Sequence, residues 1–129
     1  MTNKEKEKEK GISRLKYVKI SPRKARLAAN LIRGMRVEEA LIQLKYFRTK
    51  PAGFIAKAVK SALSNLENEA DYLKREDLIV EEIRVDCGPV AKRSKSKCRG
   101  GRAPILKRTS HVKVVVGLFN KENKKSRVK

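Results

Sequence analysis

A run of cations without any carboxylate is the part of this sequence whose residue types could do chemistry. No Asp or Glu lies between Cys87 and Phe119, but Lys and Arg recur there: Lys92, Arg93, Lys95, Lys97, Arg99, Arg102, Lys107, Arg108 and Lys113. Burying so many unpaired cations would destabilise a small domain, so the segment must lie in water or against dense negative charge. The chemistry available to it is phosphate neutralisation, in which each Lys or Arg that meets a phosphate releases condensed counterions.

Two cysteines and one histidine are the alternative reactive groups. Cys87, Cys98 and His111 offer three soft ligands at irregular spacing, a poor match to a zinc site. A Cys-His nucleophile pair would need an orienting base and an enclosed pocket, yet the carboxylates cluster in other segments. A reducing compartment leaves both cysteines as thiols. We therefore expect no metal, no cofactor and no catalytic residue, and we expect that the protein is not an enzyme.

Length and net charge limit the fold and the partner. The 129 residues suit one domain, and 34 Lys and Arg against 14 Asp and Glu give a net charge of +20. Such a charge attracts nucleic acid or an anionic membrane, and does not by itself choose between them. No apolar run approaches the roughly 20 residues needed to span a bilayer, and the N-terminus lacks the apolar core of a secretion signal. We expect an intracellular, soluble protein with no membrane partner.

The excess charge is confined to two segments. Residues 11–37 hold eight basic side chains and no acid, residues 38–86 hold eight basic and ten acidic ones, and residues 87–121 hold ten basic and none acidic. Two basic segments around a balanced body are expected to meet one partner. Residues 4–10 alternate Lys and Glu, so residues 1–10 are expected to be a disordered lead-in, and residues 120–129 a basic tail.

The expected elements begin with a strand over Ile12–Ile20 and a helix that starts at Ser21-Pro22. Ser21 can cap the first free amides, and Pro22 suits the first helical position. Gly34 can end this helix in a left-handed conformation. A second helix over Val37–Leu44 opens with Glu38 and Glu39, the charge that its dipole prefers.

A third helix from Pro51 is predicted by an apolar stripe, and a pair of strands follows it. The stripe comprises Ile55, Ala58, Val59, Ala62, Leu63, Leu66, Ala70 and Leu73, and the polar residues Lys57, Lys60, Ser64, Asn65 and Asn68 are expected to face solvent. Leu78–Cys87 and Ile105–Leu118 are the expected strands, with Val112, Val114, Val116 and Leu118 on the face toward this helix.

The expected fold class is therefore α+β: three helices packed on a small three-stranded antiparallel sheet, with a long protruding β-hairpin at about residues 84–108. Residues 11–119 form the single domain. At about 3.3 Å per residue the hairpin could extend about 30 Å beyond the body. A two-stranded ribbon of that length is not stable alone in water, so we expect that its partner holds it.

Several short motifs, in order along the chain, give a family resemblance. They are Ser21-Pro22-Arg23-Lys24-Ala25-Arg26-Leu27, Leu31-Ile32-Arg33-Gly34, Val37-Glu38-Glu39-Ala40-Leu41, Lys60-Ser61-Ala62, Val85-Asp86, Gly88-Pro89 and Lys107-Arg108-Thr109-Ser110-His111. From about Leu15 to Val116 the sequence closely resembles the large-subunit ribosomal protein twenty-two family of the bacterial and organellar type.

This resemblance implies a structural constituent of the large ribosomal subunit that binds ribosomal RNA, supports assembly and extends its hairpin to the wall of the nascent-peptide exit tunnel. It implies neighbouring ribosomal proteins and the nascent peptide as further partners, no homo-oligomer, and a cytoplasmic ribosome, with an organellar one left open. Together with the charge argument it predicts these RNA-binding residues: Arg14, Lys16, Ser21, Pro22, Arg23, Lys24, Arg26, Arg33, Lys92, Arg93, Lys95, Lys97, Arg99, Arg102, Lys107, Arg108, Thr109, Ser110 and His111.

Two other functional classes match the sequence less well. An architectural DNA-binding protein with a basic β-arm would carry apolar wedges at the arm's tip and a dimer face, and neither is evident. An RNA-modifying enzyme would need a cofactor loop or a catalytic cluster. No Phe, Tyr or Trp lies between Gly88 and Val116, so structured RNA suits the hairpin better than single strands read by stacking.

Overall fold

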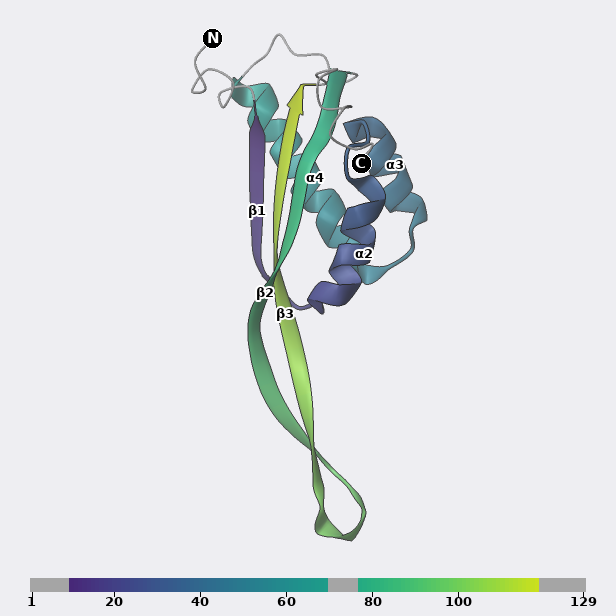
Figure 1. Cartoon of the computed structure of the whole chain (residues 1–129), viewed down its shortest axis with the longest axis vertical. Coiled ribbons are helices and arrows are strands. Elements are labelled where there is room, and N and C mark those ends of the chain that lie inside the picture. The colour runs from purple at the N-terminus through teal and green to yellow at the C-terminus, as the bar shows by residue number, and fades with distance from the viewer. Residues whose placement is uncertain (1–9, 70–76, 119–129) are drawn as a thin grey trace, which may run out of the picture.

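The last of the described strands lies in the middle of its sheet (Figure 1). A computed structural model describes residues 10–69 and 77–118 of the protein. In chain order the elements are β1 (Gly11–Val18), α2 (Pro22–Ile32), α3 (Val37–Tyr46), α4 (Lys50–Glu69), β2 (Leu78–Ser96), the short 3-10 turn η2 (Cys98–Gly100) and β3 (Arg102–Leu118). β3 pairs antiparallel with both β1 and β2, so the strand order is β1-β3-β2. The predicted α+β fold with three helices and a three-stranded antiparallel sheet is confirmed.

The helices cover one face of the sheet. On β3, Val112, Val114 and Val116 are buried, as a strand with one covered face requires. They join Ile55, Val59, Ala62 and Leu66 of α4 in one hydrophobic core. The predicted apolar stripe is thus confirmed over the described part of α4. Ala70 and Leu73 lie outside the described residues. The core fixes α4 across the sheet, and none of the described helices covers the other face of the sheet (Figure 1).

Helix α2 begins at the predicted Ser21-Pro22 pair. Pro22 occupies the first turn, and Ser21 is the N-cap residue with an extended backbone. The expected capping hydrogen bond is absent from this end, because the Ser21 side chain bonds none of the first amides. After the helix, Gly34 has a φ of 73°, the left-handed conformation expected of it. Its backbone N–H donates to the Val80 carbonyl, which joins the end of α2 to β2.

Asn65 shows that one predicted solvent-facing residue has an internal contact. Its side-chain amide donates a hydrogen bond of 2.9 Å to the Ile12 carbonyl, at the outer edge of β1. The backbone of Gly11 lies even closer to α4, because a Cβ at this position would lie 2.1 Å from the Ala62 carbonyl oxygen. The polar face of α4 therefore includes residues that cover the edge of the sheet.

Strands β2 and β3 continue well beyond the body as a two-stranded ribbon (Figure 1). The ladder runs out to the Ser96–Arg102 pair, past the limits of Cys87 and Ile105 expected for the strands. Pro104 does not interrupt it, because both strands of the ribbon have a free edge there and an edge tolerates proline. From Asp86 to Thr109, a stretch described without a gap, no residue is buried.

The tip of the ribbon is a tight turn that uses two positive φ angles. Arg99 has a φ of 57° and Gly100 a φ of 71°. The turn is closed by the Lys97 backbone N–H, which donates to the Gly101 carbonyl across 2.7 Å. The tip is therefore a defined five-residue connection between the paired residues Ser96 and Arg102, and Arg99 is its middle residue.

Candidate nucleic-acid interface

The cations of the hairpin are all exposed. This holds for Lys92, Arg93, Lys95, Lys97, Arg99, Arg102, Lys107 and Arg108. None of them forms an ion pair with a carboxylate in residues 10–69 and 77–118, and the one hydrogen bond is from Arg93 to the neighbouring Lys92 carbonyl, at 2.8 Å. Their charges are therefore free for an external anion.

The strand register keeps these cations apart. Lys92 pairs with Leu106, Arg93 with Ile105 and Lys95 with Ala103. Lys107 faces Ala91 and Arg108 faces Val90. Like charges placed directly opposite each other destabilise a sheet, and the register of the ribbon avoids every such pair. Because successive side chains of a strand alternate, both faces of the ribbon carry positive charge.

The residues at the root of the hairpin contact one another. Thr109 donates from its hydroxyl to the Pro89 carbonyl at 2.7 Å. His111 accepts a hydrogen bond at Nδ1 from the Tyr17 backbone N–H at 3.0 Å, and the two rings meet edge to face with centroids 4.8 Å apart. Both strand partners of β3 are irregular here, since register shifts occur between Leu15 and Val18 and between Cys87 and Val90.

Ser110 lies between these two neighbours but does not reach the surface. It is 0% exposed, and its hydroxyl has no hydrogen-bond partner within the described residues. Pro22, at the start of α2, is buried as well. The predicted RNA contacts of Ser110 and Pro22 stay predictions, and through these two side chains they could only be indirect.

The four cations predicted on and just after α2 separate into two pairs. Arg23 and Lys24 are exposed and have no hydrogen-bond or ion-pair partner in the part of the chain that the structure describes. Arg26 instead donates through Nε and Nη2 to the Val85 carbonyl, at 3.3 and 3.2 Å. Arg33 donates to the Ile83 carbonyl at 3.1 Å. The second pair thus bonds to the free edge of β2, while the first pair remains available to a partner.

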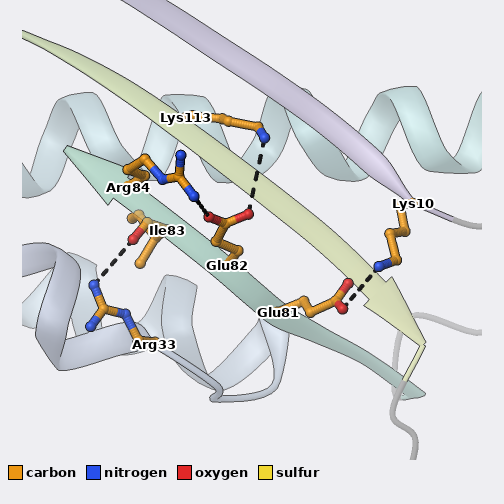
Figure 2. A network of polar contacts seen from close by, with 7 residues as sticks. All are labelled: Lys10, Arg33, Glu81, Glu82, Ile83, Arg84 and Lys113. Carbon is orange, nitrogen blue, oxygen red and sulfur yellow. Dashed lines mark hydrogen bonds and ion pairs between the residues drawn. The ribbon is translucent and has the colours of Figure 1, made fainter. Parts of the chain in front are cut away.

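The open face of the sheet holds further cations. Arg14 and Lys16 of β1 were predicted RNA contacts, and both are exposed. Arg84 and Lys113 lie on the same face and were not predicted (Figure 2). A signal for both exists in the sequence: each stands between two apolar residues of a strand, so period two places it opposite the core.

The part of the chain that the structure describes, residues 10–69 and 77–118, holds no cluster of metal-ligating side chains. No group of three or more His, Cys, Asp or Glu side chains there could hold a metal ion. Cys87 and Cys98 are exposed free thiols. A pocket of about 630 Å³ between α3 and α4 is lined mostly by apolar and basic residues, together with Thr49, and its lining includes no carboxylate, histidine or cysteine. None of the described helices is both long enough and apolar enough to cross a membrane.

Comparisons with known proteins agree with the family resemblance. The family model described as "Ribosomal protein L22p/L17e" matches residues 13–117. The chain is 54% identical over 102 residues to the large ribosomal subunit protein uL22 of Chlamydia pneumoniae, covering 79% of this chain and 91% of that protein. The corresponding protein of Protochlamydia amoebophila strain UWE25 is 54% identical over 101 residues, covering 78% and 90% of the two chains.

Proposed function

The chain belongs to the ribosomal protein L22p/L17e family, of the bacterial type, and from this membership we propose that it binds large-subunit ribosomal RNA through its hairpin and the start of α2. As a member of the family it is a structural constituent of the large ribosomal subunit. Its relatives are proteins of bacterial ribosomes, so its location is the cytoplasmic ribosome.

The observation that supports RNA binding most strongly is the hairpin's unpaired charge. Eight exposed cations on a ribbon with no buried residue have no ion-pair partner among the described residues, and the ribbon contributes nothing to the core. An isolated ribbon is not stable in water, but phosphates packed on both its faces would neutralise it and hold it extended. Arginine adds bidentate contacts to phosphate, which favours Arg93, Arg99 and Arg102 as the residues that fix RNA geometry.

The proposal extends to the path and the partners of the ribbon. We propose that the tip around Arg99 reaches the wall of the exit tunnel, where it meets the nascent peptide, and that the body contacts neighbouring ribosomal proteins. Contacts from the body and from the ribbon to separate RNA segments would support assembly of the subunit. Residues 11–119 are proposed as the single domain, flanked by a lead-in and a basic tail that lie mostly outside the described residues.

Salt-dependent binding tests this function. We expect the full chain to bind a transcript of bacterial large-subunit ribosomal RNA with an affinity that falls steeply as salt is raised. Replacing Arg93, Arg99 and Arg102 by Gln should weaken binding and reduce the slope of log K against log salt by about 3, or about 1 per lost phosphate contact. The matched control replaces Lys45, Lys57 and Lys60, exposed cations of α3 and α4, by Gln.

Two results would contradict the proposal. The first is an equal loss of affinity in the control variant, because net charge alone would then explain binding. The second is equal affinity for random duplex DNA at moderate salt, which would favour the architectural DNA-binding class. Cosedimentation of the chain with the large subunit in both high and low magnesium is expected, and a substantial free pool would count against a structural constituent.

A further inference from the structure

Three cations from three strands stand in one row across the open face of the sheet. Arg14 of β1 is the direct partner of Lys113 of β3, and Lys113 is the direct partner of Arg84 of β2. Neighbouring strands lie about 4.8 Å apart, so the three backbones fall within about 10 Å across the sheet. The opposite face at this level is packed on the helices, because Val112 and Val114, on either side of Lys113, belong to the core.

This arrangement is the reverse of the one in the hairpin. The ribbon pairs its cations with uncharged residues, but the body places three like charges directly opposite one another, which disfavours the folded sheet. The row also lies in a regular part of the ladder, between the shift at Glu82 and the shifts near Tyr17 and Cys87. A local rule broken at a regular position is typical of a functional site.

Two carboxylates, Glu82 and Asp86, lie near the row, and among the described residues only Glu82 forms ion pairs with it. Glu82 accepts a hydrogen bond of 2.6 Å from Arg84 and lies 4.0 Å from the Lys113 ammonium (Figure 2). The Arg84 side chain remains 61% exposed and Lys113 31% exposed. Arg14 and the nearby Lys16 have no ion-pair partner among residues 10–69 and 77–118. Positive charge therefore remains uncompensated on the β1 side of the row.

A hollow lies over the same residues. Its volume is about 470 Å³, and its lining includes Arg14, Lys16, Arg84, Asp86 and Lys113. A chain of phosphates laid across the strands would place successive anions over successive cations. It would relieve the repulsion that the strand register creates, and the guanidinium groups of Arg14 and Arg84 suit bidentate contacts to phosphate.

We propose that the row Arg14, Lys113 and Arg84 is a second RNA-binding site, separate from the hairpin, which holds a segment of ribosomal RNA backbone running across the three strands. It rests on the proposed function, because RNA is the polyanion assigned to this protein. Glu82 is part of the site: in the free protein it takes the place of a phosphate for Arg84 and Lys113, and it competes with the RNA.

Substitutions at this site are expected to change RNA affinity in opposite directions. Arg14→Gln should weaken binding of the full chain to a bacterial large-subunit ribosomal RNA transcript by roughly tenfold and reduce the salt slope by about 1. The same substitution should leave the melting temperature of the free protein unchanged or raise it, since it removes an uncompensated like charge. Glu82→Gln should strengthen RNA binding, by roughly two- to fivefold, and lower the melting temperature.

Lys57→Gln, at an exposed position of α4, is the matched control for Arg14→Gln and should retain nearly all the affinity. The proposed site is refuted if Arg14→Gln binds RNA as tightly as wild type, if the control variant loses as much RNA affinity as Arg14→Gln, or if Glu82→Gln weakens RNA binding. These failures differ from failure of the proposed function. If the proposed function itself failed, the wild-type chain would not bind ribosomal RNA preferentially, or the variant with Arg93, Arg99 and Arg102 replaced by Gln would bind RNA as well as its own control.

Discussion

The backbone N–H of Tyr17 donates a hydrogen bond of 3.0 Å to Nδ1 of His111, although the two residues lie 94 positions apart in the chain. Tyr17 reaches this position with a φ of 56°, a left-handed conformation that costs a non-glycine residue about 1 to 2 kcal/mol. The contact joins the end of β1 to β3 where the hairpin leaves the body. It therefore anchors the root of the ribbon.

Substitution of His111 tests this anchor. His111→Phe keeps an aromatic edge-to-face contact and removes the acceptor, so we expect the free energy of unfolding to fall by about 0.5 to 1.5 kcal/mol. His111→Ala removes the ring contact as well and should lose about 0.5 to 1.5 kcal/mol more. Urea unfolding of the full chain measures both changes. Equal stability of His111→Phe and wild type would show that the hydrogen bond contributes nothing.

Gly88 is expected to tolerate no side chain. A Cβ at this position would lie 2.4 Å from Oγ1 of Thr109 and 3.2 Å from Nε2 of His111. Gly88→Ala should therefore lower the free energy of unfolding by about 1 to 3 kcal/mol. Gly53→Ala is the control: nothing lies within 4 Å of its Cβ, and alanine in a helix should raise stability by about 0.5 to 1 kcal/mol. A loss of stability in both variants would argue against the contact at Gly88.

Removal of the Ser110 hydroxyl is expected to stabilise the protein. Its buried hydroxyl has no partner within the described residues, so Ser110→Ala should raise the free energy of unfolding by about 1 kcal/mol. Ser94→Ala, on the exposed ribbon, should change it little. Thermal unfolding and RNA affinity are measured on the same samples. Lower RNA affinity without loss of stability would mean that the Ser110 hydroxyl contributes to RNA binding.

On helix α2, Arg26 is expected to contribute to stability and Arg23 to RNA binding. Arg26→Gln removes the donors to the Val85 carbonyl and should lower the free energy of unfolding by about 1 kcal/mol. Arg23→Gln removes an exposed cation from the positive end of the helix dipole, so stability should hold or rise slightly while RNA affinity falls. Chemical denaturation and filter binding check the two effects. Equal stability of the two variants would refute the division of roles.

Much of the fold follows from local patterns in the sequence. The helix start at Ser21-Pro22, the left-handed Gly34 and the apolar stripe of α4 each correspond to a physical requirement of one element, and the structure confirms them, although the Ser21 side chain forms no capping hydrogen bond. The long hairpin was predicted and is confirmed, but the strand limits were placed at Cys87 and Ile105, because hydrophobic alternation marks a strand only where one face is buried. Beyond Cys87 the ladder depends on backbone pairing, which leaves no apolar signal.

Less of the candidate RNA-binding surface could be predicted from the sequence. A basic side chain that bonds a strand edge cannot be distinguished in the sequence from one that is free, and so Arg26 and Arg33 were grouped with Arg23 and Lys24. The row of Arg14, Lys113 and Arg84 depends on the register of three strands far apart in the chain. Register is set by bulges and packing, and the spacing of charges along the sequence does not contain it.

The central position of β3 also governs when the protein can fold. β1 and β2 flank β3 and have no ladder with each other, so the sheet has nothing to assemble on until the final strand has been synthesised. The three helices, β1 and β2 precede β3 in the chain, so the apolar surfaces that pack on β3 stay uncovered until β3 has been synthesised. Completion of the body therefore waits for the synthesis of β3, and premature termination before Arg102 would leave the sheet without its central strand.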